Sequence, residues 1–149
     1  MGRDILGSAQ TGTGKTASFT LPMIDILASG RAKARMPRSL ILAPTRELAA
    51  QVSESFKKFS VNHKMSMALL IGGVSFSEQD AALSKGVDVL IATPGRLLDH
   101  FERGKVLLQD VKILVIDEAD RMLDMGFIPD VERIVSFLPV MRQTLFLSL

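Results

Sequence analysis

Six short apolar runs constrain the fold of this chain most, because nearly all are apolar at consecutive rather than alternating positions. A strand that is apolar on both faces is typical of a parallel sheet covered by helices. The runs span Asp4–Gly7, Ser39–Ala43, Ser66–Ile71, Val87–Ala92, Val111–Ile116 and Thr144–Ser148. They predict the strands of one mostly parallel sheet.

Segments with helical spacing alternate with these runs. The predicted helices are Gly14–Leu27, Thr45–Phe59, Ser75–Ser84 and Thr93–Phe101. Ser75 and Glu78 form a capping box, and Thr93 is an N-cap candidate before Pro94 at the first helical position. Strand–helix alternation predicts an α/β fold with helices on both faces of the sheet.

Composition excludes several classes of protein. The 149 residues suit one domain and are 47% hydrophobic, and zero cysteines exclude a disulfide scaffold or a thiolate zinc site. The sequence contains no run of eighteen apolar residues, so no membrane span is predicted, and the first residues lack a signal-peptide layout. We therefore expect a cytoplasmic protein. The two histidines, His63 and His100, match no metal spacing and are interpreted as surface or packing residues.

The stretch Ser8–Thr16, S-A-Q-T-G-T-G-K-T, nearly matches the phosphate loop G-x-x-x-x-G-K-[ST], with Ala9 in place of the first glycine. It lies between a predicted strand and a predicted helix, the context such a loop requires. Its backbone N–H groups and the helix N-terminus favour phosphate, Lys15 reaches the terminal phosphates, and the Thr16 hydroxyl binds Mg²⁺. The predicted nucleotide site is Ala9, Gln10, Thr11, Gly12, Thr13, Gly14, Lys15 and Thr16; a chance match is the alternative.

A carboxylate for the metal follows the fifth predicted strand, which ends at Asp117-Glu118-Ala119-Asp120. Ligands gather at the carboxyl ends of strands in such sheets, so Asp117 is expected at the same edge as Thr16. Asp117 would serve the Mg²⁺ through water, while Glu118 would orient the attacking water. An acidic helix start is the alternative, and the phosphate loop makes it the weaker one. The predicted catalytic residues are thus Lys15, Asp117 and Glu118.

Five motifs together resemble the DEAD-box RNA helicases, specifically their first RecA-like lobe. They are A-Q-T-G-T-G-K-T at Ala9–Thr16, P-T-R-E-L-A at Pro44–Ala49, Gly72-Gly73, T-P-G-R at Thr93–Arg96, and D-E-A-D at 117–120. That family carries alanine at the position of Ala9, so the resemblance implies an intact loop. It also implies ATP and Mg²⁺ as cofactors.

The resemblance implies a groove for single-stranded RNA, bound through its backbone without sequence preference. The RNA-binding residues it implies are Pro44, Thr45, Arg46, Gly72, Gly73, Thr93, Pro94, Gly95 and Arg96. Thr45 and Thr93 lie at predicted helix starts, where free N–H groups bind phosphates. Arg46 and Arg96 each either pair with a phosphate or brace their own helix. The chain has no Trp or Tyr, so base stacking is not expected.

The sequence also departs from the family. Residues 1–149 are expected to be a first lobe truncated at both ends, without the upstream motif that reads adenine. The family's third motif is Ser-Ala-Thr; here Ser148 matches and Leu149 follows it. The resemblance implies that Asp120 and Ser148 couple this lobe to a second RecA-like lobe, the expected partner.

The expected function is the ATP- and RNA-binding lobe of a helicase that couples ATP hydrolysis to local RNA unwinding. The chain alone should hydrolyse ATP barely above background, because the family keeps its arginine fingers on the other lobe. One alternative is another P-loop ATPase, although Asn62-His63-Lys64-Met65 does not fit the N-K-x-D motif of GTPases. The other is a catalytically inert nucleotide- or RNA-binding module.

Overall fold

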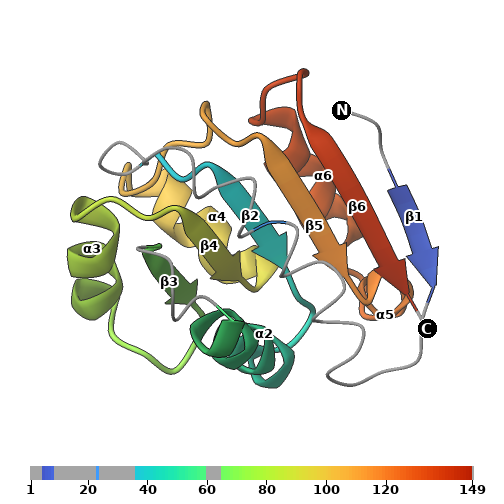
Figure 1. The fold of residues 1–149 in the computed structure, drawn as a ribbon, viewed down its shortest axis with the longest axis horizontal. Helices are drawn as coiled ribbons and strands as arrows, with labels where there is room; N and C mark the ends of the chain where they lie inside the picture. The colour runs from blue at the N-terminus through green and yellow to red at the C-terminus, as the bar shows by residue number, and fades with distance from the viewer. Residues whose placement is uncertain (1–4, 9–22, 24–35, 60–64, 149) are drawn as a thin grey trace.

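The computed structural model describes residues 5–8, 23, 36–59 and 65–148. Six strands form one sheet in the order β1-β6-β5-β2-β4-β3, and all neighbouring strands are parallel (Figure 1). The strands are β1 (Ile5–Ser8), β2 (Ser39–Leu42), β3 (Met67–Leu70), β4 (Val89–Ala92), β5 (Ile113–Asp117) and β6 (Gln143–Ser148). The predicted parallel α/β sheet is confirmed.

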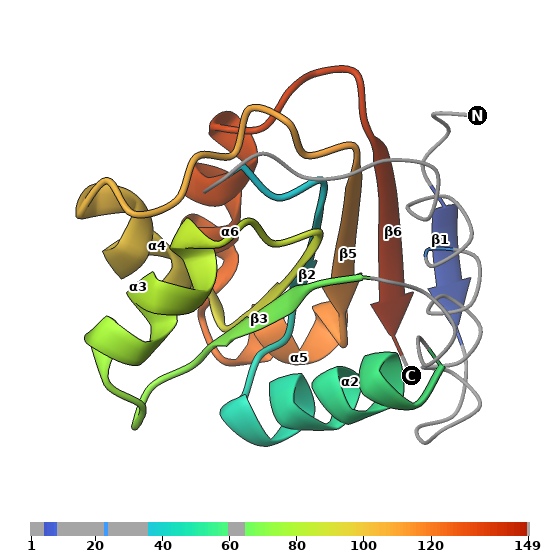
Figure 2. The ribbon, with the colours of Figure 1, turned by 60° about the vertical axis from the view of Figure 1, so that its left-hand side comes forward.

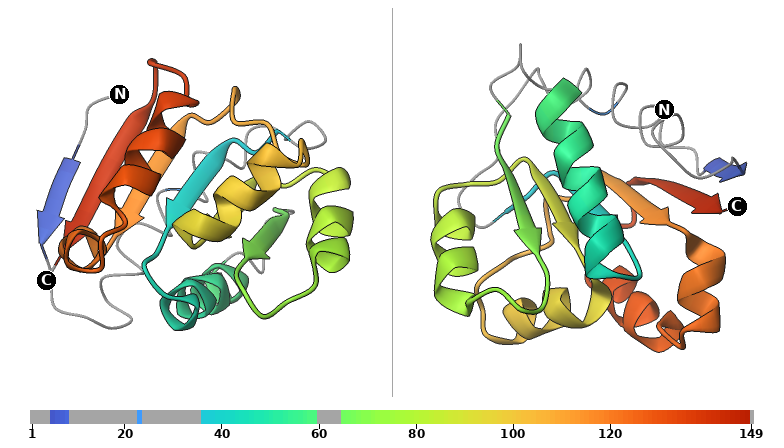
Figure 3. Two further views of the ribbon diagram at one scale, coloured as in Figure 1. Left: turned by 180° about the vertical axis from the view of Figure 1, so that it is seen from behind. Right: turned by 90° about the horizontal axis from the view of Figure 1, so that it is seen from below.

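Helices cover both faces of the sheet. They are α2 (Arg46–Phe59), α3 (Phe76–Ser84), α4 (Pro94–Glu102), α5 (Ala119–Asp124) and α6 (Ile128–Ser136). Helix α2 packs on one face, while α4, α5 and α6 lie on the other and α3 stands beside the edge strand β3 (Figures 2 and 3). Alternate residues of β2 enter the two cores: Ile41 packs with Phe56 of α2, whereas Leu42 packs with Leu97 of α4.

The burial of the strands explains their sequence pattern. Every residue of β2, β4 and β5 is buried, as consecutive apolar residues predict for strands covered on both faces. Burial alternates along β3, because β3 is an edge strand and only one of its faces is fully covered. Two-sided burial was therefore a wrong prediction for β3. It was also wrong for the described part of β6, where Phe146 is exposed.

A buried carboxylate fixes the amino ends of the three strands β2, β4 and β3. Asp88, immediately before β4, accepts hydrogen bonds from Arg38 Nη2 at 3.1 Å and from the Ser66 backbone N–H at 3.2 Å. Arg38 precedes β2 and Ser66 precedes β3. With their amino ends tied to one side chain, the three strands start level, which keeps their carboxyl ends level as well.

Helix starts follow the sequence signals in part. The Ser75 hydroxyl caps α3 by accepting from the Glu78 N–H at 3.3 Å, as the capping box predicts. Thr93 occupies the N-cap position of α4, but its side chain makes no capping hydrogen bond, so that part of the prediction was wrong. The predicted helix Gly14–Leu27 lies outside the described residues except for Met23, which is helical and buried. No helix in the described part of the chain is long and apolar enough to cross a membrane.

Candidate functional site

The strand register aligns one predicted catalytic residue with the start of the phosphate loop. Asp117 is level with Leu147 of β6, which is level with Gly7 of β1. Two strand spacings put the Asp117 backbone roughly 10 Å from Gly7. Asp117 therefore lies in the same row as the carboxyl end of β1, with β6 between them. The loop itself, Ala9–Thr16, lies outside the described residues.

The same register aligns the three segments expected to contact RNA. Leu42, Ala92 and Leu70 share one row at the carboxyl ends of β2, β4 and β3. The row continues past the strands, where the Ala43 N–H donates to Ala92 O at 3.0 Å and the Thr93 N–H donates to Leu70 O at 3.2 Å. We call the ends of β1, β6 and β5 the β1–β6–β5 half of this edge, and the ends of β2, β4 and β3 the β2–β4–β3 half.

In the β1–β6–β5 half, Asp117 and Glu118 are buried neighbours with different backbone conformations. Asp117 ends β5, whereas Glu118 has φ 54° and ψ 54° and is the only non-glycine residue with positive φ in the described part of the chain. A left-handed non-glycine residue costs about 1–2 kcal/mol. This residue turns the chain from β5 into α5, and its carboxylate lies 3.5 Å from Arg121 Nη1. The two carboxylates therefore leave the backbone in different directions.

Asp117 has the chemistry that a Mg²⁺ ion requires. Magnesium prefers oxygen ligands and is often held by one or two carboxylates together with water and substrate phosphates. Among the described residues, no group of three or more His, Cys, Asp or Glu side chains could hold a metal ion. The Asp117 carboxylate fits this requirement as one ligand, with water and substrate phosphates completing the coordination of a bound ion.

In the β2–β4–β3 half, P-T-R-E-L-A places a cation at the start of α2. The Thr45 hydroxyl accepts from the Leu48 N–H at 3.2 Å and so caps the helix. The Arg46 side chain is 61% exposed and lies 3.5 Å from Glu47 Oε1. The Arg46 guanidinium can therefore reach an anion without leaving a buried site.

The two glycines that follow β3 differ in what they require. Gly73 has φ +82°, and a Cβ there would lie 2.6 Å from Arg46 Nη1. Gly72 shows neither restriction, since nothing lies within 4 Å of an added Cβ. Glycine at 73 thus permits a left-handed turn and lets Arg46 lie against the loop.

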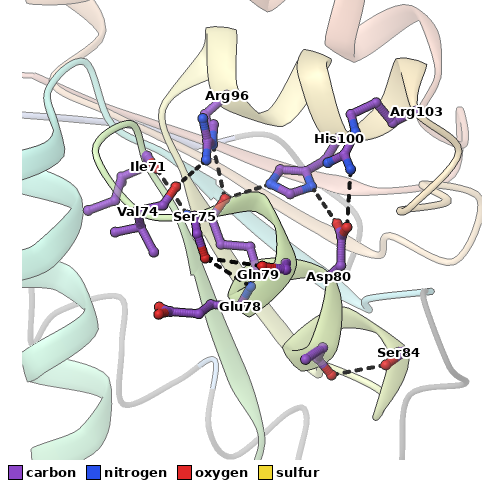
Figure 4. Close-up of polar contacts among 12 residues, drawn as sticks. Ile71, Val74, Ser75, Glu78, Gln79, Asp80, Ser84, Arg96, His100 and Arg103 are labelled. Atoms are coloured by element: carbon purple, nitrogen blue, oxygen red, sulfur yellow. Dashed lines mark hydrogen bonds and ion pairs between the residues drawn. The ribbon is translucent and has the colours of Figure 1, made fainter.

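Arg96, in T-P-G-R, is held by the loop after β3 and by α3. Its Nε donates to Gln79 Oε1 at 3.0 Å, and its Nη2 donates to the Val74 carbonyl (Figure 4). Its guanidinium carbon lies 3.6 Å from the centre of the Phe76 ring, a cation–π contact. Arg96 therefore braces neighbouring segments, α3 and the loop after β3. The sequence-based alternative, in which Arg96 braces its own helix, was wrong.

His100 lies beneath this contact and is fully buried. Its Nε2 lies 2.6 Å from Gln79 Oε1, and its Nδ1 lies 3.3 Å from Asp80 Oδ1 (Figure 4). Burial lowers the pKa of His100; the charges of Arg96 and Arg103 lower it further, and Asp80 opposes them. The interpretation of His100 as a packing residue is confirmed.

The remaining predicted site residues lie at the same edge. Thr93 is half-buried, Pro94 and Pro44 are buried, and Gly95 and Asp120 are exposed. Ser148 ends β6, level with Ser8 of β1. The roles of these residues in RNA binding and in coupling to a second lobe stay predictions.

The family model for DEAD/DEAH box helicases matches residues 1–148. The chain belongs to the DEAD/DEAH box helicase family.

Curated relatives agree with this assignment. The chain is 47% identical to "DEAD-box ATP-dependent RNA helicase 52A" of Oryza sativa over 99% of its length, which is 27% of that protein. It is 48% identical to "ATP-dependent RNA helicase CshA" of Listeria monocytogenes, again over 99% of this chain and 28% of that one. The chain therefore spans about a quarter of the relatives it matches.

Solved DEAD-box structures share the fold. A DEAD box protein from Methanococcus jannaschii superposes with a TM-score of 0.88 at 39% identity, covering 98% of this chain and 39% of that one. The yeast DEAD-box splicing factor Prp28 gives 0.89 at 36% identity, covering 98% and 37%. Around the motifs, the structure adds three contact residues that the sequence did not single out: Gln79, Asp80 and Arg121. One signal for Gln79 was present: it is a polar residue four positions before the core residue Leu83, on the inward face of α3.

Proposed function

We propose that this chain is the nucleotide- and RNA-binding lobe of a DEAD-box RNA helicase. The observation that carries the proposal is the register of the sheet. It places Asp117 in the same row as the end of β1 and three further motifs at the ends of β2, β4 and β3, along one edge. The family match over residues 1–148 supports the same reading.

The β1–β6–β5 half would bind ATP. Lys15 and the backbone of the phosphate loop would hold the phosphates, and Thr16 with Asp117 would hold Mg²⁺, which would neutralise charge on the transferring phosphate. Glu118 would position the attacking water. Its left-handed backbone and its ion pair with Arg121 fix the direction of that carboxylate before substrate arrives.

The β2–β4–β3 half would bind single-stranded RNA through its backbone. The N–H groups in the first turns of α2 and α4 have no backbone partner within their helices. The Leu48 N–H donates to the Thr45 hydroxyl, and the others can donate to phosphates. Pro94 has no N–H, so Gly95 and Arg96 provide the donors at α4. Such contacts carry no base information, and we propose binding without sequence preference.

The activity of the whole protein is part of the same proposal. A second RecA-like lobe would complete the site, and the pair would couple ATP hydrolysis to local unwinding of RNA. Two relatives that match this chain are named ATP-dependent RNA helicases. These matches favour neither another class of P-loop ATPase nor an inert binding module.

Two titrations of the 149-residue chain test the proposal. Saturating Mg²⁺–ADP should raise its melting temperature, since a ligand of the folded state stabilises that state; Lys15→Ala should remove the shift. Polyuridine and a mixed-sequence RNA of equal length should bind equally, with affinity that falls as salt rises. A melting curve that ADP does not move, or RNA binding that ignores salt, would contradict the proposal.

A further inference from the structure

Gln79 is the centre of the polar contacts in the β2–β4–β3 half. The residue is 4% exposed. Its Nε2 donates to the carbonyls of Leu69 at 3.3 Å and Ile71 at 3.0 Å, and its Oε1 accepts from Arg96 Nε. A carbonyl oxygen cannot donate, so His100 Nε2 carries the proton it shares with Gln79 Oε1. Both donors and both acceptor positions of the amide are thus used.

The partners of Gln79 come from two of the segments expected to contact RNA. Leu69 and Ile71 belong to the end of β3 and the approach to Gly72-Gly73, while Arg96 and His100 belong to α4. One side chain therefore fixes the distance between the glycine turn and the first turn of α4. Arg96 adds a second link through Val74, within the same turn.

Arg96 and Arg46 are used differently although both lie in this half. Arg96 has two edges of its guanidinium bonded to protein and one face stacked on Phe76. Arg46 is mostly exposed, and its ion-pair partner is the exposed Glu47. Binding a phosphate would cost Arg96 its bonds to Val74 and Gln79, whereas Arg46 would lose little.

A second layer holds this arrangement from behind. Asp80 Oδ1 lies 3.3 Å from His100 Nδ1, and Asp80 Oδ2 accepts a hydrogen bond from Arg103 Nη2 at 3.2 Å. Both His100 and Arg103 also lie against the Phe76 ring, at 5.0 Å and 4.3 Å. His100 and Arg103 therefore hold the Phe76 ring in place, and the ring in turn holds the Arg96 guanidinium in one position.

We propose that Gln79 and Arg96 are positioning residues of the RNA groove, which hold the Gly72-Gly73 turn and the start of α4 at a fixed spacing and contact no phosphate. The inference rests on the proposed function of this half. Backbone donors on two separate segments bind successive phosphates only when their spacing matches the strand. Loss of the brace thus weakens RNA binding without removing a phosphate contact.

The salt dependence of RNA binding distinguishes a brace from a phosphate contact. Each phosphate contact on a single strand contributes about 0.7 to the slope of log K against log salt. Gln79→Ala and Arg96→Lys should each weaken polyuridine binding about tenfold, the change that one net hydrogen bond supports, with an unchanged slope. Arg46→Met should reduce the slope by about 0.7, while Arg46→Lys should keep it.

Arg96→Lys is the decisive variant because it keeps the charge but cannot form the planar fork. A phosphate contact would largely survive this change, so near-normal affinity for Arg96→Lys would overturn the inference. So would a slope that falls by about 0.7 in Arg96→Met. Glu78→Ala is the matched control: it removes an exposed side chain next to Gln79 on α3 and should leave RNA affinity unchanged.

Amide hydrogen exchange tests the brace without RNA. In Gln79→Ala and Arg96→Lys, residues 71–75 and 93–96 should exchange faster together, while residues 113–117 stay unchanged. If exchange in both loops is unchanged in these variants while the unsubstituted chain binds RNA normally, the brace is wrong and the proposed function stands. Absence of salt-dependent RNA binding by the unsubstituted chain would instead overturn the proposed function.

Discussion

The two halves of the sheet edge position their functional residues by different means. In the β2–β4–β3 half, Gln79 and Arg96 hold neighbouring segments through side-chain hydrogen bonds to backbone carbonyls. In the described part of the β1–β6–β5 half, strand register places Asp117, and one left-handed residue directs Glu118. The side-chain hydrogen bonds hold two backbone segments at a fixed distance from each other, whereas the left-handed residue sets the direction of a single carboxylate.

The difference has an energetic consequence. Removing one member of a buried hydrogen-bonded group leaves its partners unsatisfied, at about 1–3 kcal/mol for each group. Removing a strained residue instead releases energy. Loss of a hydrogen-bonded residue in the β2–β4–β3 half should therefore lower stability, whereas replacement of the left-handed Glu118 by glycine should raise it. Four stability predictions test this, from the largest expected effect to the smallest.

Gln79→Ala should lower the free energy of unfolding by about 4 kcal/mol or more, because the Leu69 and Ile71 carbonyls and the Arg96 and His100 donors each lose a partner. Urea denaturation measures the change. The matched control is Glu78→Ala, an exposed neighbour on the same helix, which should stay within about 0.5 kcal/mol. Equal effects of the two substitutions would show that the network contributes little.

Gly73→Ala should cost about 1–2 kcal/mol, because alanine at φ +82° is strained. The exposed Arg46 guanidinium can move away from the new Cβ at little cost. The control, Gly72→Ala, has open space around the new Cβ and should be near neutral. Thermal denaturation of both variants compares the two positions. If they lose equal stability, the left-handed turn at Gly73 is not the constraint.

Lowering the pH below about 6.5 should destabilise the fold through His100. Burial lowers the pKa of folded His100, so the unfolded chain takes up a proton first and the folded state loses stability, by up to about 1.4 kcal/mol per pH unit. Above pH 6.5 both states are neutral and the effect ends. His100→Gln should flatten this part of the profile in urea titrations at several pH values, whereas His63→Gln should not. If His63→Gln flattens the pH profile instead, the pH dependence does not come from His100 and the prediction is wrong.

Glu118→Gly should raise the free energy of unfolding by roughly 0.5–1 kcal/mol, since glycine adopts positive φ without the cost that glutamate bears. The control is Asp120→Gly, at a right-handed helical position of α5, which should lose stability. Denaturant midpoints of the two variants give the signs. Destabilisation by Glu118→Gly would mean that the contacts of the buried Glu118 side chain, among them its ion pair with Arg121, outweigh the backbone strain.

The sequence predicted most of the sheet because its signal is local. Consecutive apolar residues located every strand to within a few residues, and the motif order placed Asp117 and Glu118 after β5. The edge position of β3 could not be predicted in this way, since strand order depends on pairing between distant segments. Helix α5 has six residues, too few for a helical period to be detected.

The side-chain contacts of the site were harder to predict. Gln79 and His100 come from different helices and meet only after α3 and α4 pack, so no spacing along the chain reveals their bond. Arg96 carried an ambiguous signal, because an arginine at a helix start fits a phosphate contact or a brace. Threonine is a favoured N-cap residue and Thr93 occupies the N-cap position, yet its side chain makes no capping bond, because its rotamer depends on packing that the sequence does not show.

Parallel titrations of one variant from each half test the division of the edge most directly. With the 149-residue chain, Asp117→Asn should weaken Mg²⁺–ADP binding at least about tenfold, roughly 1.4 kcal/mol, and leave polyuridine affinity unchanged. Arg46→Met should do the reverse and reduce the salt slope of RNA binding by about 0.7. If either substitution weakens both ligands to the same extent, the two halves do not act as separate binding regions.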